Sequence, residues 1–201
     1  MTESNHRSAD HPIDPLFLNR WSPRAFTGES MPPETLATLF EAARWAPSSG
    51  NGQPWFFVYG HRGTEAFDRI YRTLDEGNRR WTDKASVLAV ILSRTHRRAQ
   101  TGELRPAYTH AFDTGAAWHA LALQATLSGY HVHAMGGIDR EAAMSALSVP
   151  TEAFRVEAGL AIGKIAAPET LPDDLRARET PSQRKPVADF AFEGQFAGET
   201  P

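Results

Sequence analysis

The stretch Ala85–Ser93, with the sequence ASVLAVILS, decides the fold of this chain. Apolar side chains fill it throughout instead of alternating with polar ones, which predicts a central strand covered on both faces. Its inner part, Val87–Leu92, is the best apolar run of the chain and has the length of a strand. Because a bilayer-spanning helix takes about 20 apolar residues, no membrane segment is expected.

Helices and strands are expected to alternate on both sides of this strand. The expected helices cover about 14–19, 32–46, 64–76, 108–128 and 139–147, and the further strands cover 55–59, 130–134 and 156–162. Asp14 and Asp139 are in position to cap helices, and Gly129 to end the longest one. The arginines and the histidine between 94 and 98 are expected in a solvated loop. The alternation predicts an α+β fold, a three-layer α/β sandwich without internal repeats.

The two ends of the chain differ from its middle. Residues 1–12 are polar and are expected to form a flexible tail ahead of a single domain, 13–201. Residues 165–201 are rich in proline and charge but carry Phe190, Phe192 and Phe196. Because exposed aromatic clusters are unfavourable, this segment is expected to be an arm laid over its own body or over a second subunit.

Composition excludes several classes of protein. The 201 residues carry a net charge of −3 and no cysteine. A general nucleic-acid binder is therefore not expected, and disulfides, iron–sulfur clusters and cysteine nucleophiles are excluded. The polar start lacks the apolar region of a secretion signal, so the default location is the cytoplasm. His131 and His133 would face one way on a strand, but no third metal ligand accompanies them at useful spacing.

Four short segments are candidates for binding. In an extended segment, Arg20, Ser22 and Arg24 project to one side, as an oxyanion receptor would need; the alternative is three solvated loop residues.

The second group lies between a helix end and a strand, where it forms either a ligand-reading loop or an ordinary turn. It consists of Ser48, Ser49, Asn51 and Gln53.

The third is Met135-Gly136-Gly137, where paired glycines allow close approach of a flat ligand or merely a tight turn. Arg184-Lys185-Pro186 adds a basic point that is suited to a phosphate or is simply solvated. The P-loop spacing and the G-x-S-x-G elbow of hydrolases are both missing.

Taken in order along the chain, these motifs resemble the nitroreductase family of FMN-dependent oxidoreductases. The resemblance is most specific at Ala42–Trp55 and continues through Arg20–Phe26, Glu76–Asn78, Asp113–Ala117, Met135–Gly137 and Arg184–Pro186. It implies a nitroreductase-like fold with a mixed, mainly antiparallel central sheet flanked by helices. It also implies a homodimer with FMN at the interface and a C-terminal arm, 165–201, exchanged between the subunits.

The resemblance assigns a set of cofactor-binding residues: Arg20, Trp21, Ser22, Arg24, Pro47, Ser48, Ser49, Asn51, Gln53, Asn78, Met135, Gly136, Gly137 and Arg184. By analogy with the family, Arg20, Ser22 and Arg184 would bind the FMN phosphate. Arg24 and Asn78 would approach the pyrimidine edge of the flavin. The loop 48–53 would come from the other subunit, and the paired glycines would lie over the ring.

The implied activity is electron transfer from NADPH or NADH through FMN to a small planar acceptor, by a ping-pong mechanism. The cofactor carries the chemistry, so no catalytic side chain, metal, nucleic acid or membrane is implied. Two departures remove positive charge: family members often have a basic residue where Ser182 stands, and some have a lysine at Trp81. The alternative is therefore a flavin-binding protein with non-nicotinamide chemistry or little catalysis.

Overall fold

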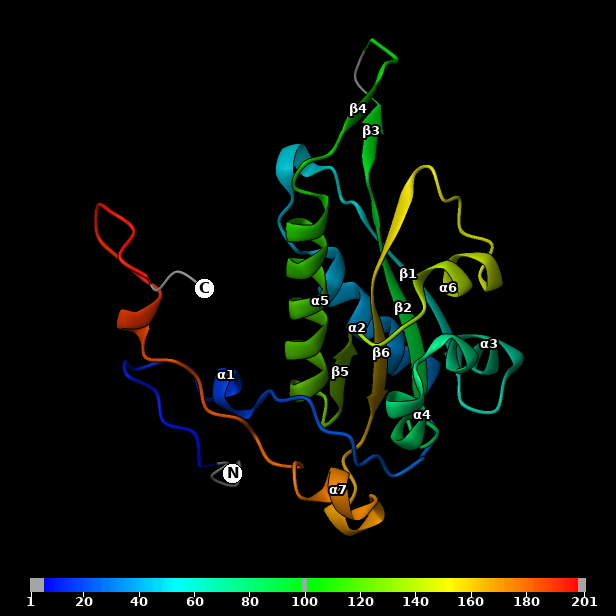
Figure 1. The fold of residues 1–201 in the computed structure, drawn as a ribbon, viewed down its shortest axis with the longest axis vertical. Coiled ribbons are helices and arrows are strands. Elements are labelled where there is room, and N and C mark those ends of the chain that lie inside the picture. The colour runs from blue at the N-terminus through cyan, green and yellow to red at the C-terminus, as the bar shows by residue number, and fades with distance from the viewer. Residues whose placement is uncertain (1–5, 99–100, 199–201) are drawn as a thin grey trace.

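The computed structural model describes residues 6–98 and 101–198, and its centre is a four-stranded sheet (Figure 1). The strand order is β1 (Trp55–His61), β2 (Val87–Arg94), β6 (Phe154–Gly163) and β5 (His131–Met135). All three pairings are antiparallel, which confirms the expected mainly antiparallel sheet. No helix within the described ranges is long and apolar enough to cross a membrane.

The strand β2 is buried on both faces, as its sequence predicts. Its residues from Val87 to Ser93 are at most 3% exposed. Leu88, Val90 and Leu92 enter one apolar cluster, while Val87, Ala89 and Ile91 enter the other. Alternation along the strand therefore divides the core into two layers.

Helices cover each face of the sheet, so the three-layer sandwich is confirmed (Figure 1). One layer contains α2 (Pro33–Arg44) and α5 (His110–Leu127), which pack against β2 through Leu39 and Leu121. The other contains α3 (Glu65–Thr73), α4 (Glu76–Thr82) and α6 (Arg140–Ala146). The expected caps are present: Asp14 accepts the Leu16 amide at α1 (Pro15–Asn19), and Asp139 accepts the Ala142 amide at α6.

The helix expected over 64–76 is in fact two helices. Its first part ends at Thr73 because the chain there pairs with the segment after β5: the Asp139 amide donates to Thr73, and the Asp75 amide donates to Gly137. The Asp75 carboxylate then accepts the Asn78 amide at 2.7 Å and caps α4. This break places Asn78 next to the paired glycines.

The arginine-rich segment is a β-hairpin and not the expected solvated loop. Its strands β3 (His96–Arg98) and β4 (Leu104–Pro106) pair in antiparallel register and project beyond the sheet (Figure 1). Three residues per strand are enough for backbone pairing without an apolar pattern. For that reason no sequence pattern predicts these strands.

The C-terminal arm follows β6 and has little regular structure. It contains the short turns η2 (Pro168–Thr170), α7 (Asp173–Arg176) and η3 (Val187–Asp189). Residues 6–12 lie along it: Arg7 donates to the Ser182 carbonyl at 2.9 Å, and the Val187 amide to Asp10. The body of the chain does not cover the arm's aromatic end, since Phe196 is 78% exposed.

Candidate functional site

A basic cavity forms where the segment after α1 meets the C-terminal arm, and we call it the arginine pocket. Its volume is about 270 Å³. Five guanidinium groups line it, those of Arg7, Arg20, Arg24, Arg178 and Arg184. The side chains of Ser22, Thr180 and Ser182 add hydroxyls, and Trp21 and His133 complete the wall. The structure thus brings together five residues that the sequence analysis selected: Arg20, Trp21, Ser22, Arg24 and Arg184.

The electrostatics of the arginine pocket favour an anion. No carboxylate is present among the described residues that line it. Burial lowers the pKa of Arg20, and the neighbouring guanidinium of Arg184 lowers it further. The same two causes, in the same order, lower the pKa of Arg7. Because like charges gathered in a partly buried space repel one another, a bound phosphate or carboxylate would relieve this strain.

The sequence did not indicate that Arg7, Arg178 and Thr180 line the pocket. Ser182 was interpreted only as the loss of a basic residue near the flavin. In the structure, the Ser182 hydroxyl accepts a hydrogen bond from Arg184 at 2.8 Å and lines the pocket. Arg178 supplies a cation from a position four residues earlier. The arm has too few apolar residues to reveal its path, so no local pattern could show which of its cations turn inward.

A buried carboxylate fixes the arm against the segment that carries Arg20–Arg24. One oxygen of Glu179 accepts the amide of Arg24 at 2.6 Å and that of Ala25 at 2.8 Å. The other lies 3.9 Å from the guanidinium of Arg24, and the Glu179 side chain is 1% exposed. These contacts determine where Arg178, Thr180, Ser182 and Arg184 sit, because all four lie within five residues of this anchor.

Two histidines with lowered pKa values lie at the arginine pocket: His133 lines it, and His131 lies near Trp21. Burial lowers the pKa of His133 to about 4 and that of His131 to about 4. His133 Nδ1 lies 2.9 Å from the Pro23 carbonyl, so the neutral ring donates there. The His133 ring packs at 4.7 Å from Trp81, which is 3% exposed. Position 81 is therefore a core position beneath the pocket.

The paired glycines lie beside the start of α4. Asn78 Nδ2 donates to the Gly137 carbonyl at 3.0 Å. A Cβ on Gly137 would overlap the side chains of Asp75 and Asn78, whereas one on Gly136 would meet nothing within 4 Å. Gly136 thus leaves open space next to a backbone that a flat ligand can approach. Met135 is 3% exposed, so its side chain belongs to the core and only its backbone is available.

The loop after α2 is held by hydrogen bonds within itself and lies away from the arginine pocket. Ser49–Asn51 forms a short turn, η1, after Pro47 and Ser48. The Ser48 hydroxyl accepts the Gln53 amide at 3.0 Å, and the Gln53 side chain donates to Asn51 at 3.1 Å. Both Asn51 and Gln53 have positive φ, 53° and 44°.

Within one chain, this loop and the arginine pocket lie at opposite ends of α5 (Figure 1). Ser49 binds Asp113 in the first turn of that helix, through a 3.1 Å hydrogen bond from its amide. Trp21 lies instead near His131, which follows the other end of the helix, with ring centroids 6.4 Å apart. One chain therefore does not assemble all the selected residues into one site.

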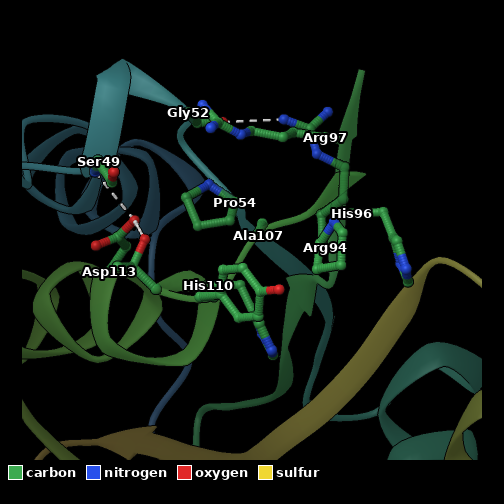
Figure 2. A pocket seen from close by; sticks show the side chains of 12 residues that line it. Ser49, Gly52, Pro54, Arg94, His96, Arg97, Ala107, His110 and Asp113 are labelled. Atoms are coloured by element: carbon green, nitrogen blue, oxygen red, sulfur yellow. Dashed lines mark hydrogen bonds between the residues drawn. The ribbon is translucent and has the colours of Figure 1, made fainter. Parts of the chain in front are cut away.

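A second cavity adjoins the loop, and Figure 2 shows it from close by. It has a volume of about 160 Å³. Ser49 and Asp113 lie on one side of it, and Arg94, His96 and Arg97 lie on the other. Sequence reasoning had placed these basic residues in a solvated loop, so this cavity was not expected.

The fold and these sites define an α+β protein with an anion pocket and an open backbone approach for a flat ligand. The model of the nitroreductase family matches residues 18–72 and 60–164. The chain therefore belongs to the nitroreductase family, whose members are oxidoreductases.

Solved structures agree with this family. The chain is 52% identical to the crystal structure of an oxidoreductase containing FMN, with a TM-score of 0.95 over 99% of this chain and 100% of that one. A nitroreductase-like protein solved with FMN from Desulfovibrio desulfuricans shares the fold, with a TM-score of 0.72 at 21% identity over 94% of this chain and 100% of that one.

Curated relatives match over a shorter stretch. The chain is 37% identical over 76 residues to a protein of Streptomyces coelicolor, covering 38% of this chain and 37% of that protein. It is 36% identical over 89 residues to one of Leptothrix cholodnii, covering 40% and 43%. Both carry the name "Putative NADH dehydrogenase/NAD(P)H nitroreductase". The chain thus spans about two fifths of these relatives.

Replacing the buried anchor tests how the arm is held. In Glu179→Ala, the amides of Arg24 and Ala25 lose their acceptor in a buried place, at a cost of about 1–3 kcal/mol. We expect residues 165–198 to be cleaved by trypsin at least about five times faster, as followed by mass spectrometry. Glu193→Ala, at an exposed arm position, is the control. Equal cleavage of both variants would contradict an anchoring role for Glu179.

The buried histidines predict a pH dependence of stability. Their folded pKa of about 4 lies below the ordinary 6.5, so the unfolded chain binds protons more readily. The free energy of unfolding is then greatest above pH 6.5 and falls as the pH drops towards 4, by up to about 3 kcal/mol for each histidine. Urea unfolding between pH 7 and 4.5 measures this slope. His133→Gln should flatten it, whereas the exposed His11→Gln should not.

Proposed function

We propose that this protein is an FMN-dependent oxidoreductase that passes electrons from NADPH or NADH to a small planar acceptor. The arginine pocket is the observation that supports this proposal most strongly. Its guanidinium and hydroxyl groups are the donor set that suits a phosphate, and 270 Å³ is ample for that group. The relative that is 52% identical along its whole length is described as containing FMN.

The other selected residues fit the rest of the cofactor. Arg24, tied to Glu179, would place its charge at the pyrimidine edge of the flavin, where a cation stabilises the reduced form. Gly136 leaves room for a flat ring, and Asn78 holds the backbone of Gly137 in place. A bound FMN would supply the redox chemistry, so the protein's part is to hold, orient and shield it.

We further propose that the site is completed in a homodimer. The loop with Ser48, Ser49 and Asn51 would then come from the second subunit, since it lies too far from the arginine pocket of its own chain. The outer face of α5 supports this assembly: Phe112 is 81% exposed and Leu127 is 66% exposed. An exchanged arm would also cover Phe190 and Phe196.

The alternative of a flavin-binding protein with little catalysis rested on missing positive charge. Arg7 and Arg178 supply cations to the arginine pocket that the sequence did not reveal, so we prefer the enzyme. The absorption experiment described next distinguishes the proposed function from flavin chemistry that does not use a nicotinamide.

The visible absorption spectrum of the purified protein tests the proposed function. We expect flavin bands that bleach when NADPH or NADH is added without oxygen. Flavin bands that persist with both reductants would point to non-nicotinamide chemistry or to binding alone. A colourless protein that takes up no added FMN would contradict the proposal.

A matched pair of variants tests the arginine pocket. Arg20→Ala removes a cation from its wall, and we expect the dissociation constant of FMN to rise at least about tenfold, because charged hydrogen bonds to an anion are lost. Quenching of flavin fluorescence measures this constant. Arg72→Ala removes the same charge from an exposed position of α3 and should leave it unchanged. An equal effect of both variants would assign the loss to net charge and not to the pocket.

A further inference from the structure

The cavity beside the loop 48–53, which we call the hairpin cavity, shares no described lining residue with the arginine pocket. It is enclosed by the loop, the end of β2, the strand β3 and the start of α5 (Figure 2). Ser49 belongs both to its wall and to the loop proposed to reach the flavin of the second subunit. A ligand in this cavity would therefore lie near a flavin.

The two arginine side chains of the hairpin cavity differ in the contacts that they make. Arg94 is held in place: it donates to the Gly52 carbonyl at 2.9 Å, and its guanidinium lies 5.9 Å from the Phe56 ring. Arg97 is exposed and makes no hydrogen bond or ion pair among the described residues. Its guanidinium extends to the loop, 3.7 Å from where a Cβ on Gly50 would be. Within the described part of the chain it is an unpaired cation in the wall of the cavity.

The acidic groups near the hairpin cavity already have hydrogen-bond partners within the chain. One oxygen of Asp113 accepts the Ser49 amide and, at 2.9 Å, the Thr109 hydroxyl. Glu157 lies under the cavity, where a bulge in β6 leaves it without a partner on β2. Its carboxylate binds Arg155 at 2.9 Å and the hydroxyl of Ser93.

His110 also lines the cavity, and its surroundings disfavour the charged imidazolium. Burial lowers the pKa of His110, and the charge of Arg155 lowers it further. Its Nδ1 is 2.7 Å from the Ser93 hydroxyl. Arg94 and Arg97 bring two positive charges to the wall and Asp113 brings one negative charge, so an excess of positive charge faces the cavity, with His96 beside the two guanidinium groups.

The size of the hairpin cavity limits its ligand. A cavity of about 150 Å³ is known to hold a benzene ring. The 160 Å³ here therefore suits one ring or one phosphate-sized group and not a whole dinucleotide. The lining of the cavity is partly apolar and partly charged, since Pro54, Ala107 and Tyr108 add apolar surface beside the cations.

We propose that the hairpin cavity is an oxyanion subsite that selects substrates carrying a carboxylate or phosphate, and that the Arg97 guanidinium binds this anionic group. The proposal rests on the proposed function, because a substrate bound here would exchange electrons with the nearby flavin. Two sources share this chemistry: the carboxylate of a small planar acceptor and the phosphate of NADPH. Both would pair with the Arg97 guanidinium, which has no partner among residues 6–98 and 101–198.

Binding without turnover is the first test. Benzoate and inorganic phosphate are titrated into the purified protein while amide chemical shifts are followed by NMR, with benzamide as the neutral counterpart of benzoate. We expect shifts in residues 49–54 and 94–97 with at least one anion and none with benzamide. Arg97→Ala should weaken the binding about tenfold. Arg98→Ala is the control, because Arg98 lies next in the strand but donates to the Gly102 carbonyl outside the cavity.

Kinetics with matched substrates separate the two sources. If the acceptor supplies the charge, Arg97→Ala raises KM for 4-nitrobenzoate about tenfold and leaves kcat and KM for 4-nitrobenzamide unchanged. If the reductant supplies it, KM rises for NADPH and not for NADH. Arg97→Lys, which keeps the charge, should restore part of either loss.

The proposal is overturned if neither anion shifts residues at the cavity, or if Arg97→Ala and Arg98→Ala behave alike. Circular dichroism of both variants establishes that they fold. A protein that binds benzoate at the cavity but shows no flavin reduction would contradict the proposed function and leave the oxyanion subsite standing. The reverse result, flavin turnover without any effect of Arg97, would remove the subsite alone.

Discussion

The rest of the structure depends on the burial of β2 on both faces. Seven consecutive residues of this strand, Val87–Ser93, are at most 3% exposed. A sheet with helices on one face only would leave half of these side chains in contact with solvent. The strand β2 therefore requires α2 and α5 on one side and α3 and α6 on the other, with strands paired along both of its edges. Because the layers are filled with apolar side chains, polar groups are left to the connections at the sheet's ends. The arginine pocket and the hairpin cavity both lie at such connections.

A second constraint arises because the arginine pocket gathers like charges. Several guanidinium groups do not collect in a small space unless something holds them there. Glu179 does so by accepting the amides of Arg24 and Ala25, which lie 155 and 154 residues away along the chain. The other oxygen of the same carboxylate lies 3.9 Å from the guanidinium of Arg24. Glu179 therefore anchors the arm and also partly balances one cation of the pocket.

The sequence predicted the elements whose signals are local. Apolar runs and spacings gave β2 and α2, and the capping residues Asp14 and Asp139 gave the starts of two helices. It failed where pairing across the chain overrides local pattern. The helix expected over 64–76 is interrupted because Thr73 and Asp75 pair with the segment after β5. The hairpin β3–β4 is held by backbone hydrogen bonds, and no apolar periodicity predicts it.

The sequence by itself determined the layers of the fold and half of the residues that line the arginine pocket, including Arg20, Ser22, Arg24 and Arg184. Hydrophobic periodicity and motif order are properties of short stretches, so they can be read without coordinates. Only the tertiary structure decided that Arg7 and Arg178 join the arginine pocket, that Trp81 is a core residue, and that the loop 48–53 lies at the far end of α5. These facts depend on the path of the polar arm and on hydrogen bonds between distant segments, which leave no periodic trace in the sequence.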